Sequence, residues 1–341
     1  MLLASKDLWL ESLGERVRVE NVLTGQEAVV WPEELGSAHA QCSVFFPQSP
    51  ERIGSQVRRA VDRLLKSHTS QALPDDPMER FSLCRSRCLS ELELDPQSSR
   101  DLQAVFYTAE TFLSEDNDRE FQYASGLLQA VWQRPKLEYG FGQLPCMPET
   151  TQRRVAMAQS YLKPKSRCLV LGDDDLMGLC WGLTYQQGCD VFELDQRLLD
   201  FYRASPRDTL TFYQRDLTQG LPDEFHGLYD IIFTDPMYGR QGMNMFLLCC
   251  AQGLSRSEQA RLFLNTRPDL IEDGDRLVER LAEVGLRVVR HHRGFSRYRL
   301  PEQTRRMALD ALGACPLPRY FLRGLLKVPY YYSDLLEISR L

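Results

Sequence analysis

One short apolar run with an acidic ending constrains the fold of this chain most. Residues 168–175 read Cys-Leu-Val-Leu-Gly-Asp-Asp-Asp, a buried strand followed by Gly172 and three carboxylates. In nucleotide-binding α/β domains the turn after the first strand usually carries glycines and binds an anion through its backbone N–H groups. Here Asp173, Asp174 and Asp175 would repel an anion. The turn therefore predicts a site for a cationic group, such as an ammonium held by paired carboxylates.

Three later segments repeat the pattern of a short strand that ends in an acid. They are residues 189–195 with Glu193 and Asp195, residues 211–217 with Asp216 and Leu217, and residues 228–235 with Asp235. Asp173 and Glu193 lie 20 positions apart, the βαβ spacing at which an acidic side chain meets ribose hydroxyls. Ligands of open α/β sheets bind outside the carboxyl ends of the strands. We therefore expect these acids to line one pocket.

The repeats predict an α/β fold with the Rossmann-like sheet of an S-adenosylmethionine-dependent transferase. Helices are expected over residues 176–185, 244–253 and 271–284, and two further strands over 261–265 and 286–290 would complete the sheet. In this architecture Glu193 would hold the ribose and Asp216 would lie near the adenine amino group. Asp235 would lie beside the reacting centre.

Five motifs resemble, in order and spacing, the branched-chain polyamine synthases. They are residues 148–154 (Pro-Glu-Thr-Thr-Gln-Arg-Arg), 171–176, 192–198, 215–217 and 233–236, and residues 295–298 (Phe-Ser-Arg-Tyr) resemble a late segment of the family. The resemblance covers about residues 140–300. It implies a catalytic domain similar to that of spermidine synthase. The branched-chain polyamine synthases transfer aminopropyl groups from decarboxylated S-adenosylmethionine to the internal nitrogen of spermidine, and the resemblance implies the same reaction here. The chain departs from the family at Met237, where an Asp-Pro-Pro motif is usual.

The resemblance implies a role for each acidic motif. Asp235 would accept the proton of the attacking amine, whose pKa in water is near that of lysine, about 10.4. Residues 173–175 would hold an ammonium group of the donor or acceptor and would disfavour intact S-adenosylmethionine, whose carboxylate would face like charge. The other expected donor contacts are Gly172, Glu193, Asp195, Asp216 and Leu217, and the expected acceptor contacts are Pro236, Tyr238 and Tyr298. No metal is expected.

Other interpretations of these residues stay open. One of the three aspartates could cap the following helix, because Asp is a preferred N-cap. Asp235-Pro-Met-Tyr238 also differs by one residue from the Asp-Pro-Pro-Tyr tetrad of nucleic-acid amino-methyltransferases, which suggests an S-adenosylmethionine-dependent N-methyltransferase. Transfer of a 3-amino-3-carboxypropyl group, and a catalytically silent binding protein, are the remaining alternatives.

The length predicts two domains, because 341 residues exceed the usual single-domain size of about 100–200. Residues 1–140 show helical spacing over 53–65 and 99–113, and a hairpin is expected around Thr24-Gly25. This part is expected to be a smaller, mainly helical accessory domain. Residues 141–341 would form the catalytic domain with a C-terminal tail, whose tyrosines at 330–332 would either pack in a strand or stack on an alkylammonium chain.

Charge and cysteine usage bound the partners and the compartment. A net charge of −6 disfavours a nucleic-acid partner, which needs clustered Lys and Arg, and suits a polycationic small molecule such as a polyamine. No run of about 20 apolar residues exists to span a bilayer. The ten cysteines, without a secretory leader, predict a reducing cytoplasm, with Cys84 and Cys88 as buried structural thiols. A homodimer is expected.

Overall fold

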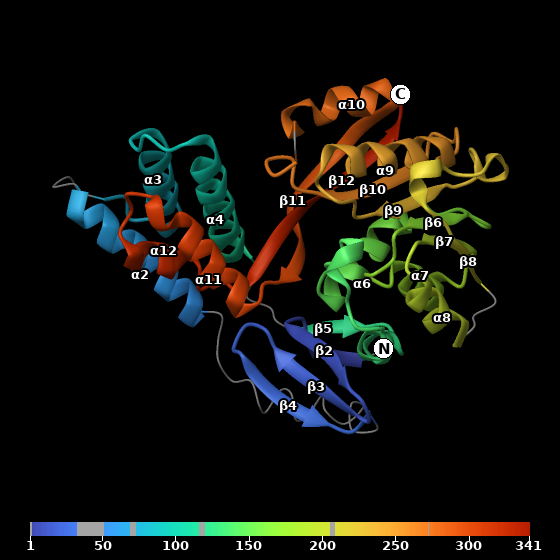
Figure 1. Cartoon of the computed structure of the whole chain (residues 1–341), viewed down its shortest axis with the longest axis horizontal. Coiled ribbons are helices and arrows are strands. Elements are labelled where there is room, and N and C mark those ends of the chain that lie inside the picture. Colours follow the sequence, from blue (N-terminus) through green and yellow to red (C-terminus); the bar gives the residue numbers. More distant parts are fainter. Residues whose placement is uncertain (1, 33–50, 69–72, 116–119, 205–208, 272) are drawn as a thin grey trace.

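The computed structural model describes residues 2–32, 51–68, 73–115, 120–204, 209–271 and 273–341. A seven-stranded sheet runs through the larger part of the molecule (Figure 1), in the order β11-β12-β10-β9-β6-β7-β8. Its strands are β6 (Cys168–Leu171), β7 (Cys189–Glu193), β8 (Leu210–Gln214), β9 (Ile231–Thr234), β10 (Arg261–Thr266), β11 (Leu286–Arg299) and β12 (Tyr330–Arg340). The first five are parallel to one another, and β12 is antiparallel to both of its neighbours, β10 and β11.

The apolar strand runs are continuous because helices cover both faces of the sheet. Val170 and Phe233 pack in one core cluster, while Leu169 and Ile232 pack in another, so neighbouring residues of β6 and β9 face opposite sides. The covering helices are α5 (Leu127–Gln133), α6 (Pro148–Met157), α7 (Met177–Tyr185), α8 (Gln196–Ala204), α9 (Arg240–Gly253) and α10 (Leu277–Glu283). The sheet and its helices confirm the predicted Rossmann-like α/β fold.

The strand order also fixes where a ligand can enter. From β6 the chain moves outward to β7 and β8, then returns to the other side of β6 through β9 and β10. The strand order therefore reverses between β6 and β9, and open α/β sheets bind ligands at such a switch point. The acidic turn that follows β6 and Asp235, which follows β9, lie on either side of it.

A small antiparallel sheet and a helical body make up the rest of the molecule. The sheet contains β2 (Leu8–Leu13), β3 (Arg16–Asn21) and β4 (Gln26–Val30), while β1 (Leu2–Ser5) pairs with β5 (Glu120–Tyr123). β3 and β4 form the expected hairpin around Thr24-Gly25. The helical body contains α2 (Glu51–His68), α3 (Pro77–Ser90), α4 (Pro96–Ser114), α11 (Glu302–Ala311) and α12 (Arg319–Leu325).

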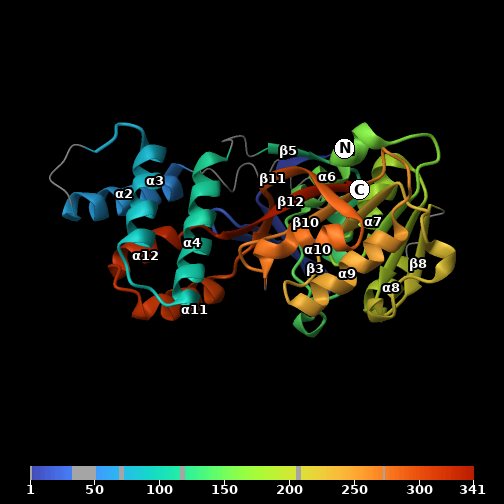
Figure 2. The same ribbon diagram turned by 90° about the horizontal axis from the view of Figure 1, so that it is seen from above.

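The helical body combines early and late parts of the chain. Figures 1 and 2 show α11 and α12 beside α2 and α4, at the end of the molecule away from β8. Phe106 of α4 and Phe321 of α12 belong to the same buried core cluster. The boundary expected near residue 140 stays a prediction, but the late helices lie with the N-terminal ones rather than on the central sheet.

Short 3₁₀ helices connect several of these elements. They are η2 (Tyr139–Phe141), η3 (Ala158–Tyr161), η4 (Leu217–Gln219), η5 (Asp223–Phe225), η6 (Gly274–Arg276) and η7 (Leu312–Ala314). The helix expected over 271–284 is shorter than predicted, since a turn with Asp273 at a φ of 55° precedes η6 and α10. The sequence of residues 70–77 predicts a loop, part of which lies outside the described residues.

Burial explains the cysteines and most of the terminal tyrosines. All nine cysteines of the described part, Cys84 and Cys88 included, are free and buried. Tyr330 and Tyr332 of β12 are fully buried, which confirms the strand interpretation for them. Across the described ranges, none of the helices combines the length and the apolar character that crossing a membrane requires.

Candidate active site

A cavity of about 890 Å³ opens at the switch point of the sheet. Of the residues expected at the site, it is lined by Asp174, Asp235, Pro236, Tyr238 and Tyr298. Further lining residues come from β2, from the end of α5 and from the segment that follows α5. They include Trp9, Trp132, Arg134 and Lys136. Distant parts of the chain thus enclose the ends of β6 and β9.

Asp235 has the properties of a base in this cavity. Its Oδ2 accepts hydrogen bonds from the Tyr298 hydroxyl at 2.5 Å and from Asn265 Nδ2 at 3.2 Å. Burial and the neighbouring charge of Asp175 raise the pKa of Asp235 to about 6, against the opposing effect of Arg154. Such a carboxylate is ionised at neutral pH, yet it accepts a proton more readily than an exposed aspartate.

Asp173 serves the local structure rather than the cavity. It is fully buried, and its carboxylate accepts from the backbone nitrogens of Met177 at 2.5 Å and Gly178 at 3.1 Å, and from the Tyr202 hydroxyl at 2.5 Å. The first two bonds satisfy backbone donors at the start of α7, although Leu176 rather than an aspartate occupies the N-cap position of this helix. Burial raises the pKa of Asp173 to about 8, against the opposing effect of these hydrogen bonds. The carboxylate of Asp173 is thus occupied by donors of the protein, and its contact with an ammonium group stays a prediction.

Asp175 is also committed to the protein. It forms an ion pair with Arg154, which is itself fully buried, and its Oδ1 accepts from the backbone nitrogen of Cys146 at 2.6 Å. Arg154 also donates to the carbonyl of Thr234 at 3.3 Å. The pair therefore ties α6 to the turn after β6 and to the end of β9. The ammonium-binding role expected for Asp175 stays a prediction.

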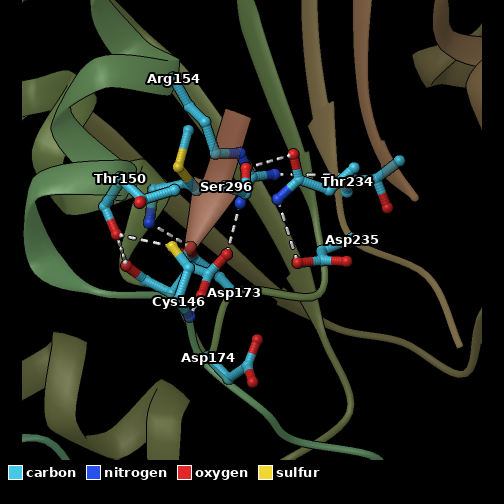
Figure 3. Close-up of polar contacts among 12 residues, drawn as sticks. Cys146, Thr150, Arg154, Asp173, Asp174, Thr234, Asp235 and Ser296 are labelled. Atoms are coloured by element: carbon cyan, nitrogen blue, oxygen red, sulfur yellow. Dashed lines mark hydrogen bonds and ion pairs between the residues drawn. The ribbon is translucent and has the colours of Figure 1, made fainter. Parts of the chain in front are cut away.

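Asp174 is the one member of the acidic turn that lines the cavity. Its carbonyl accepts from Arg134 at 2.6 Å, whereas its carboxylate points away from the surrounding network in Figure 3. Burial and the charges of Asp175 and Asp235 raise its pKa. A cation that entered the cavity would relieve this repulsion, so Asp174 is suited to bind an ammonium group.

The expected nucleoside-binding acids lie outside this cavity. Glu193 is 8% exposed and accepts from the backbone nitrogens of Asp173 at 2.8 Å, Leu194 at 2.7 Å and Asp195 at 2.9 Å. Gly172, with a φ of 69°, donates to the carbonyl of Phe192 at 2.9 Å. The ribose-binding role of Glu193 stays a prediction, and its carboxylate already holds the acidic turn in place.

The other residues that were expected to contact the donor also interact with residues of the protein. Asp195 is 2% exposed and binds Arg197 and Gln143, at 2.6 Å and 2.8 Å respectively. Asp216 is exposed and caps η4 through the backbone nitrogen of Thr218 at 2.9 Å, and Leu217 packs in the core. Their contacts with a donor stay predictions. Within the described residues, no group of His, Cys, Asp and Glu side chains could hold a metal ion.

Several residues at the site had no role in the sequence interpretation. Asn265 contacts Asp235, Arg154 pairs with Asp175, and Trp9 reaches the cavity from β2. A polar residue directly after the apolar run 262–264 was an available signal for Asn265. The sequence around Trp9 contains no such signal, because only the fold brings this residue to a site more than 150 residues away in sequence.

Comparison with known proteins decides the family. The model of the branched-chain polyamine synthase A C-terminal domain matches residues 124–332. The chain belongs to this family. The N(4)-bis(aminopropyl)spermidine synthase of Thermus thermophilus is 36% identical over 121 residues, which cover 34% of this chain and 35% of that protein. The enzyme of the same name from Thermococcus kodakarensis is 28% identical over 173 residues, which cover 48% of this chain and 49% of that protein.

The fold extends well beyond these sequence matches, which span half or less of each curated relative. The crystal structure of the branched-chain polyamine synthase from Thermus thermophilus, in complex with N4-aminopropylspermidine and 5'-methylthioadenosine, aligns with 84% of this chain and 93% of its own at a TM-score of 0.55. Sequence identity in that alignment is 19%. The likeness therefore shows that the polyamine synthase family shares the fold described above.

Proposed function

We propose that this chain transfers an aminopropyl group from decarboxylated S-adenosylmethionine to a nitrogen of a spermidine-like polyamine. The observation that carries the proposal is the pairing of Asp235 and Asp174 in one aromatic-lined cavity. Asp235 supplies a base near neutral pH, and Asp174 supplies a carboxylate for an ammonium. Membership of the polyamine synthase family and the names of the relatives support the same reaction.

The reaction is a nucleophilic displacement that needs little covalent chemistry from the protein. The lone pair of the acceptor nitrogen forms a bond to the aminopropyl carbon next to the sulfonium. The carbon–sulfur bond breaks, its electron pair stays on sulfur, and neutral methylthioadenosine leaves. The attacking nitrogen becomes positively charged, and its proton passes to Asp235. Fixed positions for both reactants supply much of the rate.

Aromatic side chains support a cationic acceptor. Trp9, Tyr238, Tyr298 and Tyr331 line the cavity, and the Tyr331 hydroxyl donates to that of Tyr238 at 2.9 Å. Ring faces attract alkylammonium groups by cation–π interaction, whereas their edges pack on the methylene segments between nitrogens. A phosphate backbone finds no comparable match in a chain with a net charge of −6.

The binding site should discriminate clearly between the decarboxylated and the intact form of the donor. Decarboxylated S-adenosylmethionine is expected to bind at least about tenfold more tightly than the intact compound, equivalent to about 1.4 kcal/mol. The reason is that the extra carboxylate of the intact donor would face Asp174 and Asp235. Titration calorimetry with each donor measures the ratio. Equal or reversed affinities would contradict aminopropyl transfer and would indicate that Arg134 binds a donor carboxylate.

Asp174 should affect the acceptor rather than the chemical step. Asp174→Asn is expected to raise the KM for the amine about tenfold, because a charge-assisted hydrogen bond contributes about 1.5–3 kcal/mol, while kcat changes little. Steady-state kinetics with spermidine measure both constants. Asp223→Asn, which alters a fully exposed aspartate, is the matched control. An unchanged KM in Asp174→Asn would move ammonium recognition to another part of the cavity.

A location in the cytoplasm and assembly into a homodimer are also proposals. A reducing cytoplasm is consistent with the nine free, buried cysteines of the described part. The homodimer expected from the sequence is checked by light scattering of the purified protein across a concentration series, for which a mass of twice 39.4 kDa is expected.

A further inference from the structure

Asn265 donates hydrogen bonds both to the proposed base, Asp235, and to Tyr298, which also donates to Asp235. Asn265 lies near the end of β10 and is fully buried. Its Nδ2 donates to Asp235 Oδ2 at 3.2 Å and to the Tyr298 hydroxyl at 2.9 Å. Its Oδ1 accepts from the Ser296 hydroxyl at 2.9 Å. The amide is therefore bonded at both ends, although it does not itself line the cavity.

The surrounding bonds fix which way the amide points. A flipped amide would direct its carbonyl oxygen at the Asp235 carboxylate, where two acceptors would meet without a proton between them. The hydroxyl of Ser296, which is also fully buried, stabilises the observed orientation by donating to Oδ1. Tyr298 accepts from Asn265, donates to Asp235 and lies 3.1 Å from the Ser333 hydroxyl.

Both donors reach the same oxygen of Asp235. Tyr298 and Asn265 bind Oδ2, and among the described residues Oδ1 has no hydrogen-bond partner. Because Asp235 lines the cavity, Oδ1 is the oxygen left for an amine. We propose that Asn265 is a positioning residue that, fixed by Ser296, orients Asp235 so that Oδ1 receives the proton of the acceptor amine.

This inference rests on the proposed function and extends it to a residue outside the cavity. The Asn265 and Tyr298 hydrogen bonds favour the ionised form of Asp235 and so oppose the rise in its pKa that burial causes. The other titratable groups that interact with Asp235 are Asp174, Asp175, Arg154, Cys146, Tyr238 and Tyr331. Substitution of Asn265 leaves all of them in place.

The test combines a titration with kinetics in Asn265→Ala. Loss of one hydrogen bond to the carboxylate should raise the pKa of Asp235 by about one unit, since one unit corresponds to 1.36 kcal/mol. Carbon-13 NMR of the aspartate carboxyls, with the Asp235 signal assigned by its loss in Asp235→Asn, measures that shift. The acid limb of the plot of kcat against pH should shift to higher pH by the same amount. The kcat on the plateau of this plot should fall about tenfold, because the base loses its orientation.

Two further variants separate positioning from general damage. Ser296→Ala keeps the amide but frees its orientation, so a smaller shift in the same direction is expected. Thr266→Val is the matched control, because Thr266 is the next residue of β10 and its buried hydroxyl has no hydrogen-bond partner in the part of the chain that the structure describes. In Thr266→Val, the pKa of Asp235, the dependence of kcat on pH and the thermal unfolding temperature should match those of the wild type.

The results either support or overturn the positioning role. An unmoved Asp235 titration in Asn265→Ala, or a shifted titration with wild-type turnover, would overturn it. So would equal effects in Asn265→Ala and Thr266→Val, because they would indicate general damage to β10. If the wild-type protein transferred no aminopropyl group, the proposed function would fail, while the NMR titration would still decide whether Asn265 controls Asp235.

Discussion

Turnover is expected to fall about 10²–10⁴-fold when Asp235 is replaced by asparagine, the usual contribution of acid–base catalysis. The substitution preserves size and most hydrogen bonding but removes the group that accepts the amine proton. Donor affinity should stay nearly unchanged, because Asp235 acts on the acceptor nitrogen. Single-turnover rates and donor calorimetry on the same preparation separate the two effects.

Asp230→Asn is the matched control for this substitution. Asp230 immediately precedes β9, and Asp235 immediately follows it, so the control alters the opposite end of the same strand. Its turnover should match that of the wild type. Near-normal turnover in Asp235→Asn would mean that another group accepts the proton, with Asp174 the first candidate because it lines the same cavity.

Arg297→Met is expected to lower the free energy of unfolding by about 3–5 kcal/mol. Arg297 is 1% exposed, and it binds Glu149 at 2.6 Å, Asp7 at 3.0 Å and the carbonyl of Lys6 at 2.8 Å. It thereby ties β11 to α6 and to the N-terminal segment. Methionine would fill part of the space but would remove the cation shared by the buried carboxylates of Asp7 and Glu149, and Glu149 would keep the more distant Arg153 at 3.7 Å.

Urea unfolding measures this loss, provided that one cooperative transition is observed. The control is Arg306→Met, since Arg306 is 75% exposed at the side chain and, of the residues that the structure describes, pairs only with Glu302 in α11. An exposed pair of this kind contributes about 0–1 kcal/mol. Similar stability in both variants would show that the buried network adds nothing beyond a surface ion pair.

The central sheet was predictable because its signals are local and repeated. The apolar runs of β6, β7 and β9 each end in or are followed closely by an acid, and the spacing between β6 and β7 admits one helix, as in a βαβ unit. The family predicted from the motifs is confirmed as well. Helix ends were less certain: α9 begins at Arg240, four residues before the expected start, and β11 extends to Arg299 because it pairs with the long β12.

The division of labour within the acidic turn could not be predicted. Asp173, Asp174 and Asp175 look equivalent in sequence, yet their roles depend on Tyr202 and Arg154, which other elements bring to the turn. Only Asp174 is left for the cavity. In the same way, the contact between Asn265 and Asp235 exists because β10 lies beside β9, and no local pattern records which strands become neighbours.

The most direct test of aminopropyl transfer is the mass of the product. Purified protein is incubated with spermidine and decarboxylated S-adenosylmethionine, and in parallel with the intact donor and either spermidine, DNA or RNA. Aminopropyl transfer predicts a polyamine heavier by one aminopropyl unit per transfer, methylthioadenosine as co-product, and product formation at least about 10²-fold slower in Asp235→Asn. Methylated nucleic acid, or a polyamine carrying a 3-amino-3-carboxypropyl group from the intact donor, with no aminopropyl product, would contradict it.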